Sequence, residues 1–313
     1  MRRIKDVLVS NDGACTCLKT GKTGYLGEKN EEKKLSSPVY TEEGKKIIQA
    51  NHMASAYFRY LLTHMQQDGS AYLKKRGFAQ KEIEQYDFGF SGMYGNNLYK
   101  FLLDKGATKE TVLAAGLAKE KEGNKIVDAF WNRVMIPITN VDGYIVAFGG
   151  RTLKKDDVCK YLNTAETEVF KKGENLFMYD TARNSPCTSY ILCEGYMDTL
   201  TMQKNGFTNA VASLGTSLTE YQTLMLQTKP NVYLMYDNDD AGVKATLRAI
   251  PMLKNKGIRV VNLFPYKDPD EFLQERSTED LVDRIQNAKS AADFIREKMK
   301  EKDSRLIEYL LSA

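Results

Sequence analysis

The fold is decided by two stretches, Tyr190-Ile191-Leu192-Cys193-Glu194-Gly195-Tyr196-Met197-Asp198 and Val232-Tyr233-Leu234-Met235-Tyr236-Asp237-Asn238-Asp239-Asp240-Ala241-Gly242. Each begins with a short apolar run typical of a buried strand and continues through an acidic residue into a helical pattern. Further strands are expected at residues 210–212 and 259–264, and helices at 197–204, 218–227 and 241–254. Short apolar strands that alternate with helices predict a Rossmann-like parallel sheet, which we assign to residues 187–272.

The acidic residues of this segment follow the ends of the predicted strands. Glu194 follows the first strand, Asp237 the third and Asp268 the fourth, and Asp239 and Asp270 repeat the pattern two residues further on. The carboxyl ends of parallel strands meet at one edge, so these loops are expected to converge. Either Asp-rich loop alone is more often a helix cap or a solvated turn, but their joint occurrence favours a hard divalent cation, Mg²⁺ or Mn²⁺.

Outside this segment the patterns are mixed. Residues 1–45 have little periodicity and predict a poorly ordered tail or the remnant of another module, whereas residues 273–313 predict a C-terminal helical region. Residues 46–186 predict a mixed α/β subdomain that starts with an amphipathic helix from Lys46 to before Asp68. Within it, a helix is expected at 70–75 and a hairpin of strands at 133–139 and 144–149.

Composition excludes several classes of function. The net charge of +4 is too small for a protein that binds nucleic acid through its whole surface, so any such contact requires a local patch. The five cysteines are an odd number, and Cys15 and Cys17 have no second pair of ligands nearby, so neither a disulfide framework nor a zinc site is expected. His52 and His64 read as ordinary helix positions. Without a long apolar run or a secretory signal, the chain is expected in the cytoplasm.

Several motifs together resemble the Toprim domain of bacterial DnaG-type primases. They are Glu194 to Asp198, Ala212-Ser213-Leu214-Gly215-Thr216, Asp237 to Gly242 and Asp268-Pro269-Asp270. The resemblance implies a DNA primase, a nucleotidyltransferase that makes short RNA primers on single-stranded DNA from ribonucleoside triphosphates. It implies a metal cluster of Glu194, Asp237, Asp239, Asp268 and Asp270, with catalytic roles for the first three.

Upstream motifs extend the resemblance over roughly residues 50 to 275. Tyr72 to Phe78 looks like an early helical signature of the family, and the stretches at 132–138, 148–151, 160–167 and 170–173 resemble its basic ridge. By position, the nucleotide or template contacts would be Arg133, Arg151, Lys160, Tyr161, Asn163 and Lys172. Ala129 and Trp131 stand where the family usually carries arginines.

Zinc ligands, which the family usually carries in an N-terminal module, do not appear in the first 45 residues. The chain therefore reads as a fragment, or as a shortened primase that relies on a zinc-domain partner or the replicative helicase in trans. Two alternatives remain open: a Toprim-type nuclease, and a degenerate primase that only binds single-stranded DNA.

Overall fold

The computed structural model divides the chain into two compact units, Met1–Ser36 and Ser37–Ala313. It describes residues 38–300 except 66, 155, 216 and 254–256, together with four short strands in the first unit. These strands pair antiparallel in the order β1 (Arg2–Ile4), β2 (Val7–Val9), β3 (Ala14–Cys17) and β4 (Thr23–Tyr25). Cys15 and Cys17 fall on β3, but their side chains lie outside the described residues, as does Thr216.

The second unit begins with a long helix that organises the N-terminal subdomain, residues 38–186. Helix α1 (Glu42–His64) starts four residues before the expected Lys46 because Thr41 caps it, its Oγ1 accepting from the Gly44 N–H at 3.0 Å. The expected helix that follows is α2 (Gln67–Lys75). The other helices of this subdomain are α3 (Gln80–Gln85), α4 (Asn97–Asp104), α5 (Lys109–Ala114) and α6 (Tyr179–Arg183), with the 3₁₀ helices η1 (Glu122–Asn124) and η2 (Lys172–Glu174).

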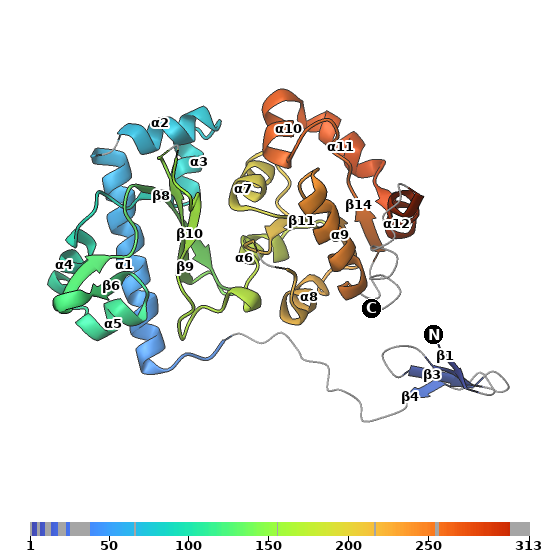
Figure 1. Cartoon of the computed structure of the whole chain (residues 1–313), viewed down its shortest axis with the longest axis horizontal. Coiled ribbons are helices and arrows are strands. Elements are labelled where there is room, and N and C mark those ends of the chain that lie inside the picture. Colours follow the sequence, from blue (N-terminus) through green and yellow to red (C-terminus); the bar gives the residue numbers. More distant parts are fainter. Residues whose placement is uncertain are drawn as a thin grey trace. The chain divides into compact units, whose positions relative to one another are not determined.

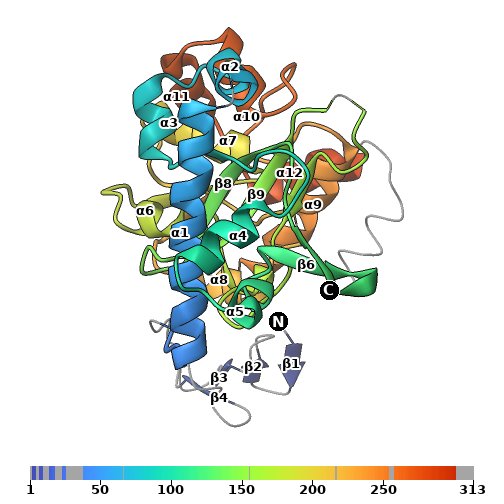
Figure 2. The same ribbon diagram turned by 90° about the vertical axis from the view of Figure 1, so that its left-hand side faces the viewer.

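Helix α1 packs against a four-stranded antiparallel sheet (Figure 2). Its order is β10 (Tyr161–Asn163), β9 (Ile145–Thr152), β8 (Arg133–Thr139) and β5 (Gly89–Phe90). The expected hairpin is confirmed as β8 and β9, and Phe58 of α1 meets Phe148 of β9 edge to face with ring centroids 5.2 Å apart. A separate hairpin joins β6 (Ala118–Lys121) to β7 (Lys125–Asp128).

An α/β segment follows, drawn beside the N-terminal subdomain in Figure 1. It was expected over residues 187–272, with a helical region after it, but its sheet also takes in a strand at 289–290 from that later region. Its sheet has the order β12 (Ala210–Ala212), β11 (Ser189–Cys193), β13 (Asn231–Leu234), β14 (Gly257–Val260) and β15 (Lys289–Ser290). The first four strands are parallel, as expected, whereas β15 adds an antiparallel edge. The helices are α7 (Tyr196–Lys204), α8 (Glu220–Leu226), α9 (Asp240–Met252), α10 (Pro269–Glu275), α11 (Thr278–Gln286) and α12 (Ala291–Lys300).

The strand expected at 259–264 ends early. Strand β14 stops at Val260, and the Asn262 side chain closes a turn by accepting from the Phe264 N–H at 2.9 Å. Phe264, expected as the last residue of this strand, lies beyond it and is 66% exposed. Among the described residues, no helix is long and apolar enough to cross a bilayer.

Candidate metal centre and nucleic-acid surface

The loops after three parallel strands meet at one edge of the sheet. Strands β11 and β13 run in register to Leu192 and Leu234, so Glu194 and Asp237 leave the sheet side by side. The Asp237 N–H donates to Glu194 Oε1 at 3.2 Å, and the Asn238 N–H donates to the Lys267 carbonyl at 2.6 Å. These bonds bring Glu194, Asp237 and the loop of Asp268 together.

Two of the predicted ligands also cap helices. Asp239 Oδ1 accepts from the Gly242 N–H at 2.9 Å at the start of α9, and Asp268 Oδ1 accepts from the Glu271 N–H at 2.8 Å at the start of α10. Each cap uses one carboxylate oxygen and so fixes the direction of the other. The capping and ligand readings of these loops are therefore compatible.

A lysine ammonium occupies the position of a cation between two of these carboxylates. Lys267 Nζ lies 2.9 Å from Asp237 Oδ2 and 3.4 Å from Asp268 Oδ2. In the described part of the chain, no three His, Cys, Asp or Glu side chains are arranged closely enough to hold a metal ion. The atoms that contact the Lys267 ammonium are carboxylate oxygens. As metal ligands, such oxygens suit Mg²⁺ or Mn²⁺ rather than a softer metal.

A further carboxylate, Asp198, lies buried behind this edge. It is 9% exposed, and its Oδ2 accepts from the Gly195 N–H at 3.2 Å. Burial, reinforced by the charges of Asp268, Asp237 and Asp270, raises the pKa of Asp198 to about 8. Burial also raises the pKa of Glu194 and of Asp237. Asp198 has no predicted role in the sequence analysis, although its place in the first turn of α7, four residues after Glu194, was a usable signal.

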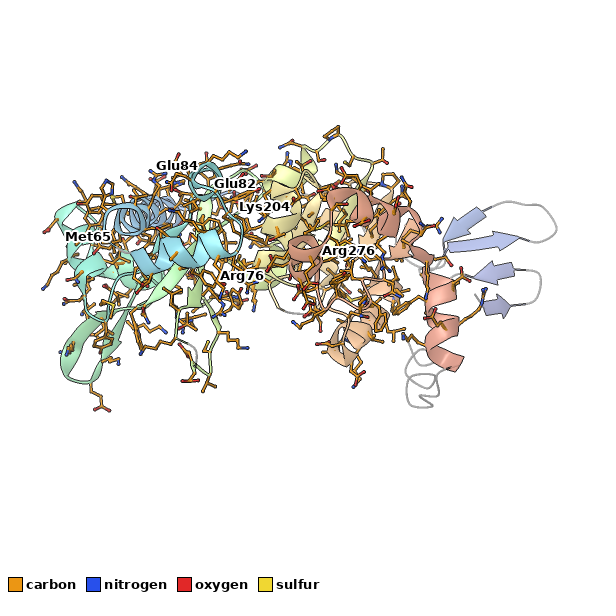
Figure 3. All side chains as sticks on the ribbon, turned by 90° about the horizontal axis from the view of Figure 1, so that it is seen from above. Met65, Arg76, Glu82, Glu84, Lys204 and Arg276 are labelled. Atoms are coloured by element: carbon orange, nitrogen blue, oxygen red, sulfur yellow. The ribbon has the colours of Figure 1, made fainter. Side chains whose placement is uncertain are left out.

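Asp270 has a different environment from the other predicted ligands. It is 2% exposed and forms an ion pair with Arg76, while Thr201 Oγ1 donates to it at 2.6 Å and Gln274 Nε2 at 2.9 Å. Figure 3 shows Arg76 where α2 approaches the α/β segment, near Lys204, whose Nζ donates to the carbonyls of Arg76 at 3.1 Å and Gly77 at 2.9 Å. Asp270 therefore joins α10 to the N-terminal subdomain, and binding a metal would require it to leave Arg76.

Arg133, predicted to contact nucleotide or template, is used within the fold. It is 7% exposed, and its guanidinium donates to the carbonyls of Gly150 at 3.1 Å and Cys159 at 2.9 Å and pairs with Asp157 at 3.1 Å. These contacts hold the loop between β9 and β10 against β8. The geometry of Arg133 therefore favours a structural role.

The glycine pair before Arg151 is required for packing. A Cβ on Gly149 would lie 2.7 Å from Cζ of Tyr196, and one on Gly150 would lie 2.9 Å from Cδ of Arg133. A glycine pair can also let a phosphate approach the backbone closely, but here side chains fill that space, so packing is the reason for the two glycines.

Three of the remaining ridge residues lie between the antiparallel sheet and the start of α7. The Arg151 guanidinium lies over the rings of Tyr161, at 5.3 Å from the centroid, and Tyr72, at 5.8 Å. The Tyr196 hydroxyl donates to Asn163 Oδ1 at 2.7 Å. Because Tyr196 is two residues after Glu194, these contacts place Arg151, Tyr161 and Asn163 next to the acidic edge. Lys160 is exposed, and Lys172 lies on η2, partly buried.

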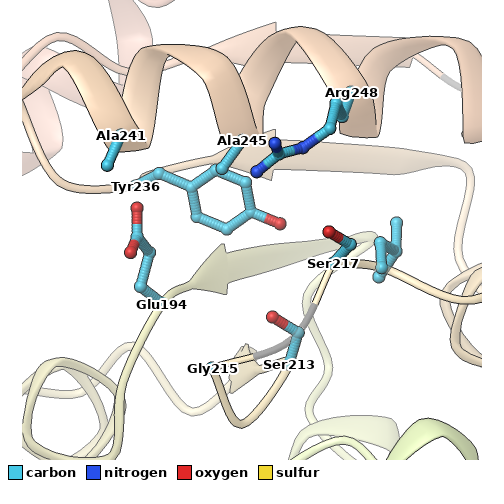
Figure 4. Close-up of a pocket in the computed structure, with 9 residues that line it drawn as sticks. Glu194, Ser213, Gly215, Ser217, Tyr236, Ala241, Ala245 and Arg248 are labelled. Carbon is cyan, nitrogen blue, oxygen red and sulfur yellow. The ribbon is translucent and has the colours of Figure 1, made fainter.

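A cavity of about 280 Å³ opens beside Glu194, between α9 and the loop after β12 (Figure 4). Glu194 and Arg248 lie at opposite ends, with the Tyr236 ring between them. One face of α9 lines the cavity with Ala241, Ala245 and Arg248. The two small alanine side chains leave room for the cavity, and the Arg248 side chain forms its far end. Ser213 and Ser217 line the facing loop. Arg248 is not among the residues predicted from the sequence; its spacing of i, i+4, i+7 with Ala241 and Ala245 was the available signal.

Comparison with known families matches both parts of this site. Residues 56–183 match the DNA primase catalytic core, N-terminal domain, and residues 191–273 match a Toprim-like domain. The DNA primase of Listeria monocytogenes is 35% identical over 258 residues, which is 80% of this chain and 41% of that protein. The chain thus spans about two fifths of the length of this relative.

Solved structures agree with this match. A DNA primase domain from Pseudomonas aeruginosa has a TM-score of 0.74 at 32% identity, covering 82% of this chain and 84% of that one. A DnaG primase catalytic domain bound to ssDNA has a TM-score of 0.75 at 28% identity, covering 86% and 91%. With two family domains in order and the acidic edge in the second, the chain belongs to the bacterial DnaG primase family and contains its catalytic core.

Proposed function

We propose that this chain is a DNA-directed RNA polymerase that makes short primers on single-stranded DNA by Mg²⁺-dependent (or Mn²⁺-dependent) nucleotidyl transfer. The observation that carries the proposal is the Lys267 ammonium between the carboxylates of Asp237 and Asp268, with the Glu194 carboxylate bonded to the Asp237 backbone N–H beside them. Converging carboxylates repel one another unless a cation lies between them, and here one already does. The membership of the primase family supports the same activity.

Each group at the edge has a role in this proposal. Divalent ions held by Glu194, Asp237, Asp239 and Asp268 would neutralise phosphate charge and make the primer 3′-hydroxyl more acidic. Glu194, which reaches the cavity, accepts the hydroxyl proton. Asp270 remains a proposed ligand that acts only after release from Arg76.

The triphosphate of the incoming ribonucleotide needs positive charge close to the acidic edge. Arg151, held over Tyr161, supplies it from the N-terminal subdomain, and Arg248 supplies it from the far end of the cavity. Lys160 and Lys172 are proposed to contact the template more loosely, because neither is fixed against an aromatic ring as Arg151 is.

The partners follow from the same proposal. Single-stranded DNA is the template, as in the related catalytic domain that was solved with ssDNA. A replicative helicase, or a zinc-domain partner supplied in trans, would assist initiation. We expect weak initiation by this chain alone and stronger extension of a supplied primer.

The test is incorporation of labelled ribonucleotides on single-stranded DNA with Mg²⁺, with and without an annealed RNA primer, beside Asp237→Ala. Loss of incorporation in the variant, with DNA binding retained, would support the proposal. Cleavage of the DNA instead would identify a nuclease. DNA binding without either reaction would identify a module that has lost catalysis.

A further inference from the structure

The lysine at the acidic edge combines a fixed backbone with an exposed side chain. The Lys267 carbonyl accepts from the Asn238 N–H at 2.6 Å, and the Lys267 N–H donates to Glu271 Oε2. These two bonds tie the residue to the loop after β13 and to the first turn of α10. The side chain is 59% exposed, so its ammonium is held by the carboxylates of Asp237 and Asp268 rather than by packing.

A single positive charge serves two carboxylates at this place. Nζ of Lys267 lies 2.9 Å from Asp237 Oδ2 and 3.4 Å from Asp268 Oδ2, and the two aspartate side chains are 18% and 20% exposed. A divalent ion would neutralise both carboxylates and take the same oxygens as ligands, whereas an ammonium can only donate hydrogen bonds to them. The ammonium and the ion therefore compete for one place, and the ion is attracted to it more strongly.

A nucleotide gives the displaced ammonium a new partner. In the proposed function the divalent ion also binds phosphate oxygens of the triphosphate, which brings these oxygens next to the place that the ammonium has left. A lysine ammonium is a point charge with three donors on a flexible stem, so it can contact phosphate oxygens without a fixed geometry. Because the Lys267 backbone is anchored on both sides, this movement needs the side chain alone.

We propose that Lys267 is an exchangeable cation: its ammonium fills the acidic edge while the metal is absent, leaves when a divalent ion binds, and then contacts the triphosphate of the incoming nucleotide. The proposal rests on the proposed function, for which that nucleotide is the substrate. The same ammonium opposes the metal at the empty edge and holds the nucleotide at the loaded one. Metal and nucleotide should therefore each strengthen the binding of the other, and Lys267 is the residue that couples them.

The test uses Lys267→Met, which keeps an unbranched side chain without the charge. Mn²⁺ binding to the nucleotide-free chain, followed by electron paramagnetic resonance, should become up to about fivefold tighter because the competing ammonium is gone. Binding of the fluorescent nucleotide mant-GTP, with saturating Mg²⁺ and no template, should become at least about tenfold weaker, which is the loss of one hydrogen bond between charged groups. Structural damage would weaken both, so the opposite directions identify the exchange.

Two further variants isolate the charge. Lys267→Arg keeps a cation at the same position, so it should bind mant-GTP more tightly than Lys267→Met does, and Mn²⁺ no more tightly than the wild type does. Lys109→Met is the matched control, because Lys109 also pairs with a carboxylate, that of Glu120 at 3.0 Å, and its side chain is 41% exposed, but it lies on α5 of the N-terminal subdomain. This variant should keep both affinities within about twofold of wild type.

Weaker Mn²⁺ binding by Lys267→Met would overturn the exchange, because the lysine would then assist the metal. Unchanged mant-GTP affinity would overturn it too, because the ammonium would then fill the empty edge without ever contacting the triphosphate. Either result would leave ribonucleotide incorporation by the wild-type chain, and hence the proposed function, intact. A wild-type chain that binds neither Mn²⁺ nor mant-GTP would count against both proposals.

Discussion

Arg76→Ala breaks the ion pair between the N-terminal subdomain and α10, and its effect on stability follows from burial. The Asp270 side chain is 3% exposed and that of Arg76 33%, so removal of the arginine leaves a buried carboxylate without its counter-charge. Breaking a buried pair from one side destabilises a protein by about 3–5 kcal/mol. Thr201 and Gln274 still donate to Asp270, so we expect the lower end, about 3 kcal/mol.

The assay is urea unfolding of the metal-free chain, compared with Arg59→Ala. Arg59 pairs with Asp87, but its side chain is 51% exposed, so this control should lose less than about 1 kcal/mol. The double variant Arg76→Ala with Asp270→Asn should recover part of the loss, because a neutral amide needs no counter-charge. Equal losses in the two arginine variants, or a double variant less stable than Arg76→Ala, would refute the reasoning.

Three more predictions concern the acidic edge. Burial raises the pKa of Asp198 from 3.8 to about 8 on folding, so the folded state loses stability as the pH rises through this interval. Chemical unfolding in EDTA should show that Asp198→Asn has a flatter pH dependence and is more stable than the wild type at pH 7, by up to about 4 kcal/mol. Gly242→Ala would place a Cβ 1.9 Å from the Asp237 carbonyl oxygen, so calorimetry should show that the free energy of unfolding falls by about 1–3 kcal/mol or more. A variant as stable as the wild type would disprove this clash. Lys267→Met removes the ammonium that competes for Asp237 and Asp268, so Mn²⁺ should bind up to about fivefold more tightly by electron paramagnetic resonance; weaker binding would show that the lysine assists the metal.

Local patterns in the sequence account for much of the fold. The alternation of apolar strands and helices after residue 187 depends on neighbours in the chain, and the structure confirms it from β11 to α9. The β8–β9 hairpin and α1 follow for the same reason, with only the helix start displaced by the Thr41 cap. The meeting of Glu194, Asp237 and Asp268 was also expected from the sequence, because parallel strands place their carboxyl ends at one edge.

Tertiary packing alone decided which charged groups remain open to a ligand. Asp270 and Arg76 lie 194 residues apart in sequence, and Arg133 reaches carbonyls on a loop well beyond its own strand. Contacts between distant elements likewise decide why position 149 must be glycine, where the Lys267 ammonium lies and how far Trp131 is exposed. A sequence pattern records what each residue is and what its neighbours in the chain allow. Whether a charge is paired or a ring is covered depends on which distant surface packs against it, and that is set only when the whole chain has folded.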